Sequence, residues 1–261
     1  MKPQLYCSLI ALILFPTLAA SESVRFSGHT FSAYLSSHGR PFYQNWEGGK
    51  NITRVHRGDE YSIVVSNPLP VSVAVAVSVD GLNTIDGEAG RLADGAKWII
   101  NAHSSITISG WQTGDSHRRR FVFSDPRYSY ARWREHQDGN YYSHKLGEIK
   151  IAYFWNRQDL HRARYRPHHY YRQKKFDEAS PSAKSRVHSE RESSGEQAGT
   201  TMGARDYSPV YTVNFHADAG MYSERDALTI YYRFAPPHYR RSYPHSEPPL
   251  RYRDFYTPEM P

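Results

Sequence analysis

The chain has 261 residues, of which 39% are hydrophobic and 14% aromatic, and its formal net charge at pH 7 is +7. A chain of this length can build a hydrophobic core without disulfide staples. The only cysteine, Cys7, lies in a segment that we expect to be cleaved off. The mature chain would then have no disulfide, no cysteine metal site and no cysteine nucleophile.

Residues 1–20 have the pattern of a signal peptide. Lys2 gives a positively charged start, an apolar run extends from Leu9 to Phe15, and small residues lead up to Ala20. The apolar run is too short for a membrane-spanning helix. We therefore expect an exported protein, periplasmic or extracellular, with no transmembrane anchor.

Residues 21–156 consist of short segments rich in aromatic and β-branched residues, separated by turn residues. This pattern, with almost no helical period, predicts an all-β fold. We expect a two-sheet antiparallel β-sandwich, Ig-like or jelly-roll-like, with about eight or nine short strands. The strand signals lie at residues 24–35, 61–65, 71–79, 97–111, 119–124 and 146–155.

The segment 71–79 carries the clearest strand signal. Valines at its odd positions alternate with Ser and Ala at its even positions, and it ends at Asp80 and Gly81. The valine face is suited to packing between two sheets, and the small residues to a closely covered back, because an exposed strand this apolar would invite aggregation. We expect a central strand that ends in a tight turn.

Only residues 125–136 favour a helical turn or two, because Asp125 followed by Pro126 is a typical helix start.

After residue 156, the composition of the chain differs from the strand pattern in two segments. Residues 157–204 form a basic, largely disordered insertion in this interpretation. Residues 205–234 are expected to add a final β-hairpin to the same sandwich, with strands at 207–215 and 227–234. The tail, residues 235–261, is rich in Pro, Tyr and Arg and is expected to be extended.

Several stretches resemble an uncharacterised family of exported bacterial proteins that has an SVDG-N turn followed by GW and SYA motifs. The matching stretches are VSVDGLNTIDGEAG (77–90), ITISGW (106–111), RFVFS and YSYA (120–131), GEIKIAYF (147–154) and GTTMGARDYSPVYTVNF (199–215). They cover about half of the mature chain in the family's order. The resemblance implies the fold and export, and it implies no activity, cofactor or site residue. The basic insertion and the tail depart from the family's pattern.

Two groups of residues are weak candidates for metal ligands. Asp80, Asn83, Asp86 and Glu88 offer several oxygens within nine residues, as Ca²⁺ prefers, although their spacing is not that of an EF-hand. Two tight turns at the Asp-Gly pairs explain the same residues better. The second group, His161, His168 and His169, would need the basic segment to fold back on itself.

The strongest interaction signal is the basic run 157–175, which contains seven Lys or Arg and one acid. Arginine and lysine neutralise anionic groups, and tyrosines between them can stack on bases or sugar rings. A second, smaller basic spot lies at His117–Arg120. The residues predicted to bind a polyanion are Arg162, Arg164, Tyr165, Arg166, Tyr170, Tyr171, Arg172, Lys174 and Lys175. A solvated loop explains this run equally well.

We therefore expect a non-enzymatic binding or structural protein of the cell envelope, without a cofactor. Its partner would be an anionic polysaccharide, lipopolysaccharide or nucleic acid bound through the basic insertion, or a protein bound through the C-terminal tail. One alternative is a cell-envelope hydrolase or metal-dependent enzyme with a His/carboxylate site. Another is an assembly subunit whose tail adds to a neighbour's sheet.

Overall fold

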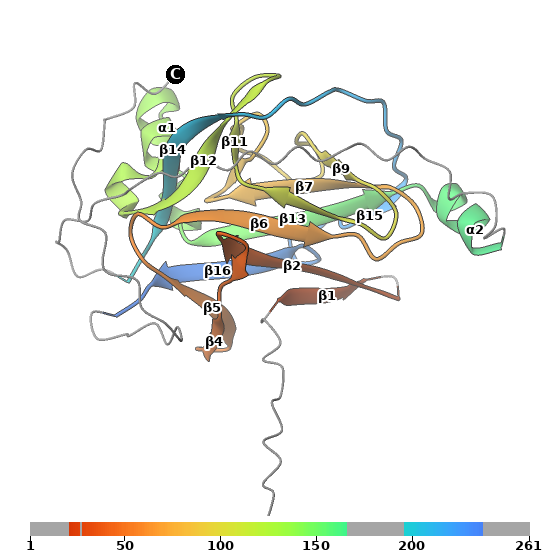
Figure 1. Ribbon diagram of the computed structural model, residues 1–261, viewed down its shortest axis with the longest axis horizontal. Coiled ribbons are helices and arrows are strands. Elements are labelled where there is room, and N and C mark those ends of the chain that lie inside the picture. Colours follow the sequence, from red (N-terminus) through yellow and green to blue (C-terminus); the bar gives the residue numbers. More distant parts are fainter. Residues whose placement is uncertain (1–20, 27, 166–195, 237–261) are drawn as a thin grey trace, which may run out of the picture.

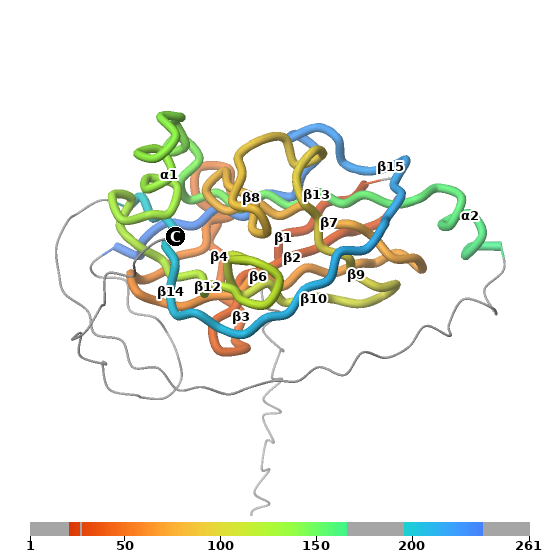
Figure 2. The backbone as a smooth tube through the Cα atoms, turned by 90° about the horizontal axis from the view of Figure 1, so that it is seen from above, coloured from red at the N-terminus to blue at the C-terminus, as the bar shows by residue number. Residues whose placement is uncertain are grey.

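The structure is a computed structural model that describes residues 21–26, 28–165 and 196–236. The described chain forms two eight-stranded sheets packed face to face, so the predicted all-β sandwich is confirmed. Figure 2 shows the two sheets as layers, with β6 and β10 in one and β7 and β13 in the other. The predicted signal peptide, most of the basic insertion and nearly all of the tail lie outside the described residues.

The first sheet has the order β1-β2-β6-β12-β11, with β3, β10 and β14 pairing beside this path. Its strands are β1 (Glu22–Phe26), β2 (His29–Ser37), β3 (Arg40–Pro41), β6 (Glu60–Ser66), β10 (Ser105–Ile108), β11 (Gly110–Gln112), β12 (His117–Ser124) and β14 (Gly199–Tyr207).

The second sheet has the order β4-β5-β16-β13-β7-β8, with β9 and β15 pairing beside this path. Its strands are β4 (Gln44–Glu47), β5 (Lys50–Val55), β7 (Val73–Val79), β8 (Leu82–Asn83), β9 (Trp98–Ile100), β13 (Glu148–Trp155), β15 (Ala219–Gly220) and β16 (Leu228–Phe234).

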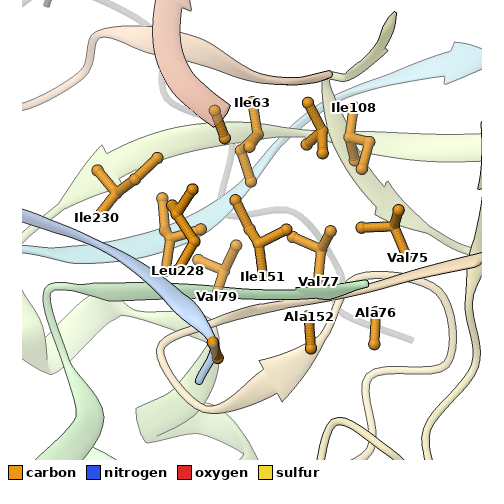
Figure 3. Close-up of a cluster of buried hydrophobic side chains, with 14 of the residues drawn as sticks. Ile63, Val75, Ala76, Val77, Val79, Ile108, Ile151, Ala152, Leu228 and Ile230 are labelled. Atoms are coloured by element: carbon orange, nitrogen blue, oxygen red, sulfur yellow. The ribbon is translucent and has the colours of Figure 1, made fainter. Parts of the chain in front are cut away.

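The valine strand occupies the position that its sequence predicts. β7 is buried along its whole length, between β13 on one side and β8 and β9 on the other. Figure 3 shows Val77 and Val79 directed toward Ile63 and Ile108 of the first sheet, whereas Ala76 points the opposite way. The valine face therefore forms part of the core between the sheets.

The chain turns sharply after β7, as predicted. Asp80 and Gly81 both have positive φ angles, of 52° and 86°, and they connect β7 to β8 as a tight hairpin. Aspartate tolerates this conformation better than most residues with a side chain.

The predicted helical region is also confirmed. A 3₁₀ helix (Pro126–Tyr128) has Asp125 as its N-cap and leads into α1 (Tyr130–Asp138). The hydroxyl of Ser129 accepts a hydrogen bond from Arg132 N and caps α1, and Gly139 ends it in the left-handed conformation. A second 3₁₀ helix (Ser143–Lys145) precedes β13.

Both predicted edges of the insertion were wrong. Residues 157–165 form a helix, α2 (Arg157–Tyr165), and β14 begins at Gly199. Because Asn156 accepts a hydrogen bond from Asp159 N and caps the helix, the start of the basic run has a local reason to be helical.

The predicted final hairpin was wrong as well. β14 pairs with β12 in the first sheet, whereas β16 pairs with β13 and β5 in the second. The pairing of β16 with β5 is parallel, which departs from the predicted antiparallel arrangement. The hairpin cannot form because the chain crosses from one sheet to the other between these strands.

The strand expected at 207–215 does not form. Ser208 N and Val210 N each donate one hydrogen bond, to Ser116 O and Asp115 O, and Pro209 has no N–H to donate. From there the chain passes along the edge of the sandwich toward β15 (Figure 2). The strand count was also too low, because the prediction missed short strands such as β4 and β5.

Candidate functional site

The basic helix α2 extends beyond one end of the sandwich, directly after β13 (Figure 1). Leu160 and Ala163 are buried and attach it to the body of the protein. Arg157 N donates to the Asp218 carboxylate at 2.7 Å, which holds the first turn against the segment before β15. The helix is thus fixed at its start and along one side, and its other side faces solvent.

The solvent-facing side of α2 carries three of the predicted polyanion-binding residues. Tyr165 is 74% exposed, and its ring lies 4.4 Å from that of His161. Arg162 forms an exposed ion pair with Asp159, and Arg164 contacts the ring of His29. Burial, and to a smaller extent the positive charge of Arg164, lower the pKa of His29.

The remaining predicted residues lie outside the described part of the chain. They are Arg166, Tyr170, Tyr171, Arg172, Lys174 and Lys175, together with the weak metal candidates His168 and His169.

The predicted second basic spot is not an open cationic surface. Arg120 donates to Glu60 at 2.9 Å and to both carboxylate oxygens of Asp206, at 2.6 and 2.9 Å. Arg118 also lies 3.8 Å from Asp206. These acids come from β6 and β14, so the pairing of distant strands neutralises what looks basic along the sequence.

The loop after β7 does not gather its oxygens around one point. Asn83 Oδ1 accepts from Ile85 N and Asp86 Oδ1 accepts from Glu88 N, which are the bonds of local turns. The Glu88 carboxylate faces Arg134 of α1 at 3.3 Å, and Asp80 is fully buried elsewhere. The turn interpretation is confirmed. Among the residues that the structure describes, no group of three or more His, Cys, Asp or Glu could hold a metal ion.

Asp80 is the centre of a buried polar network. Its Oδ1 accepts from Gly147 N at 2.9 Å and from the Tyr232 hydroxyl at 2.5 Å, and its Oδ2 accepts from Thr200 N at 2.7 Å. The Thr200 hydroxyl lies 2.7 Å from that of Tyr232 and 2.8 Å from that of Tyr61. The network joins both sheets, because Tyr61 and Thr200 belong to the first and Tyr232 to the second.

The hydroxyls of this network are all satisfied when Asp80 is ionised. Tyr232 then donates to the carboxylate and accepts from Thr200, which in turn accepts from Tyr61. Burial nevertheless raises the pKa of Asp80 to about 7, and the bonds from Tyr232, Gly147 and Thr200 limit the rise. Burial and the nearby carboxylate also raise the pKa of both tyrosines well above 10.

This network is a structural link rather than an open site. Asp80, Tyr232 and Thr200 have no measurable solvent exposure, and Tyr61 is 3% exposed. Sequence reasoning identified the turn at Asp80 but missed its partners, because they follow it by 67, 120 and 152 residues. No local signal indicates such an arrangement.

No protein-family model, curated protein or solved structure matches this chain. The family resemblance described above stays a prediction. None of the described helices is long and apolar enough to span a membrane.

Proposed function

We propose that this is an exported, non-enzymatic binding or structural protein of the cell envelope that engages an anionic polymer through α2. The exposed side of this helix supports the proposal. It has an open hollow lined by Arg157, Gln158, His161 and Arg162, and the exposed ring of Tyr165 lies beside His161. Guanidinium groups bind phosphate, sulfate or carboxylate groups, and the aromatic rings can stack on a sugar or base.

The internal ion pair of α2 does not prevent this role. Arg162 and Asp159 are both largely exposed, and an exposed pair contributes only about 0–1 kcal/mol to stability. An incoming anion can therefore replace Asp159 at small cost. Arg157 donates to a backbone carbonyl, Asp218 O, which leaves its positive charge uncompensated by that contact.

Heparin, lipopolysaccharide and duplex DNA are the probes for this proposal, each titrated against the full chain at several salt concentrations. The variant Arg162→Gln should weaken binding and lower the salt dependence by about one unit of slope, because one cation is removed. The matched control is Arg91→Gln. Arg91 is also exposed and also pairs with an aspartate three residues away, Asp94, but it lies on the loop before β9. The proposal would be contradicted by an affinity that does not depend on salt concentration. It would also be contradicted by an equal loss of affinity in Arg162→Gln and Arg91→Gln.

The enzymatic alternative would need converging His and carboxylate groups in a cleft. The most strongly perturbed carboxylate in the described residues, Asp80, is closed off from solvent and bonded on both oxygens. The assembly alternative depends on the tail, which lies almost entirely outside the described residues. No observation favours either one over polyanion binding.

A further inference from the structure

On strands β1, β2, β6 and β10, the outer face of the first sheet carries mainly hydroxyl side chains. Along β2, Phe31, Ala33 and Leu35 point into the core, so Ser32 and Tyr34 point outward. The same alternation holds on the neighbouring strands β1, β6 and β10. The outward positions of these four strands and the residue after β10, all at least partly exposed except the buried Ser36, are Ser23, Arg25, Thr30, Ser32, Tyr34, Ser36, Glu60, Ser62, Val64, Ser66, Ser105, Thr107 and Ser109. We call this surface the hydroxyl face.

The strand register places these hydroxyls in rows across the sheet. Ser23 is opposite Ser32, Ser32 is opposite Ser66, and Ser66 is opposite Ser105. One row of four serines therefore crosses four strands that lie about 4.8 Å apart. A second row, two residues along the strands, consists of Tyr34, Val64 and Thr107. This order comes from pairing between segments that are far apart in the chain.

Hydrogen bonds between neighbouring serines hold parts of the face in position. The hydroxyls of Ser66 and Ser105 lie 2.9 Å apart, and Ser62 donates to Ser109 at 2.9 Å. Because each hydroxyl can donate one bond and accept two, both pairs keep further capacity for a ligand. The face offers donors and acceptors together, at regular spacing.

The hydroxyl face carries few charges. Arg25, on the edge strand β1, and Glu60, at the start of β6, are the charged residues among its outward positions, and Glu60 forms an ion pair with Arg120 of β12 at 2.9 Å. Solvent-facing strands usually carry Lys or Glu, which discourage association between sheets. The described helices do not cover the face, because α1 and α2 lie at opposite ends of the sandwich (Figure 1). Thr107 in its second row is exposed, and Tyr34 is partly exposed.

We propose that the hydroxyl face binds a neutral polysaccharide. Sugar hydroxyls donate and accept hydrogen bonds just as Ser and Thr do, and a face with one cation and one acid that is already paired has little preference for an ionic polymer. Tyr34, next to the serine row, provides a ring on which a pyranose can stack, since its neighbours Val64 and Thr107 are short enough to leave it accessible. This site is separate from the α2 surface and does not depend on it.

The chemistry of the face argues against two other partners. An anionic polymer would be attracted by clustered cations, and only Arg25 is available here. An apolar protein surface would leave the serine hydroxyls buried without partners, which costs about 1–3 kcal/mol for each unpaired group. A hydroxyl-rich, uncharged polymer can form hydrogen bonds with these serines and does not need clustered cations.

The test is co-sedimentation of the full chain with insoluble cellulose, chitin and curdlan particles. We expect retention on at least one of them, unchanged between low and high salt because no ion pair is involved. Thr107→Lys places a long charged side chain in the second row and should reduce retention by roughly tenfold or more, a loss of about 1.4 kcal/mol. Thr212→Lys is the matched control, because Thr212 is also exposed but lies on the segment between β14 and β15. This control should bind as the parent chain does.

A second variant separates stacking from hydrogen bonding. Tyr34→Ser keeps the hydroxyl character of the face and removes the ring, so it should weaken retention while leaving the fold intact. Arg162→Gln should leave retention unchanged, which distinguishes this proposal from the one about α2. Retention on none of the three particles, or equal loss with Thr107→Lys and Thr212→Lys, overturns the proposal. The proposal is also overturned if the parent chain is a dimer that Thr107→Lys dissociates and no particle retains the protein. The face would then join two copies of the chain.

Discussion

Small residues lie on the outer faces of both sheets, but they are exposed to very different degrees. On the second sheet, Ala74, Ala76 and Ser78 of β7 are all buried. On the first sheet, the serines of β1 and β10 are exposed and those of β6 partly exposed. Small side chains therefore have two roles in this protein: to let other chain segments pack closely, and to present hydroxyls.

The cover of the second sheet comes from the chain after β7. Leu92 and Ser78 line the same small hollow, and the ammonium group of Lys97 lies 5.1 Å from the centre of the Phe154 ring. Tyr222 contacts Phe154 from the segment after β15. Phe154 and Ala74 are neighbours on the outer face, since they pair across β13 and β7. In the described chain, the hydroxyl face has no cover of this kind.

The largest effect is expected from the network that links the two sheets. Asp80→Asn should lower the free energy of unfolding by about 3 kcal/mol, because an amide cannot accept the three bonds that the carboxylate accepts. If its oxygen keeps Gly147 N and Tyr232, its NH₂ group faces Thr200 N, another donor. Chemical denaturation gives the value. Tyr232→Phe, which removes only one hydroxyl, should cost less, and an unchanged midpoint for both would show that the network does not hold the sheets together.

The pH dependence of stability reports on the same carboxylate. The pKa of Asp80 in the folded protein, about 7, is above its ordinary value of 3.8. The folded state then holds a proton that the unfolded chain has lost, so the contribution of Asp80 to stability is full below about pH 4 and falls as the pH rises to about 7. Denaturation curves over this range should show the decline in the parent chain. In Asp80→Asn the decline should be smaller, and a slope identical to that of the parent would rule out Asp80 as its source.

A matched pair of substitutions compares the two outer faces directly. Ser78→Leu adds bulk on the covered back of β7 and should destabilise the protein by about 2 kcal/mol through overpacking. Ser66→Leu makes the same change on the hydroxyl face and should alter stability by no more than about 0.5 kcal/mol. Thermal unfolding of the two variants and the parent chain measures both changes in stability. Equal losses would mean that the hydroxyl face is also covered.

The central strand and the first helical region were predictable from local signals. Alternating valines identified β7 as a central strand, and Asp125 with Pro126 marked the start of the helical region. The strand expected near residue 210 failed, although its residues favour β structure, because no neighbouring strand is available where the chain crosses between sheets. The helix α2 was not predicted, because the high charge of this segment favours a disordered loop, whereas its helical signals are only the cap at Asn156 and Leu160 and Ala163, three residues apart.

The candidate sites were less predictable than the fold. The exposed positions of Arg162 and Tyr165 agree with a binding role that the sequence suggested, and that role stays a prediction. The basic spot predicted around Arg120 is not a free cationic surface, because acids from β6 and β14 form ion pairs with Arg120. The regular rows of the hydroxyl face could not be seen before the register of β1, β2, β6 and β10 was known.

By itself, the sequence determined which residues share a face of each strand, because side chains alternate along any extended chain. Only the tertiary structure decided whether each face packs against another segment or is exposed to solvent. Asp80 became a buried link because Gly147, Thr200 and Tyr232 come to it from three other segments, and Ser66 stayed at the surface because no described segment crosses β6 as residues 84–97 cross β7. Burial depends on contacts between residues far apart in the chain, and these contacts form only when the strands pair and the sheets pack.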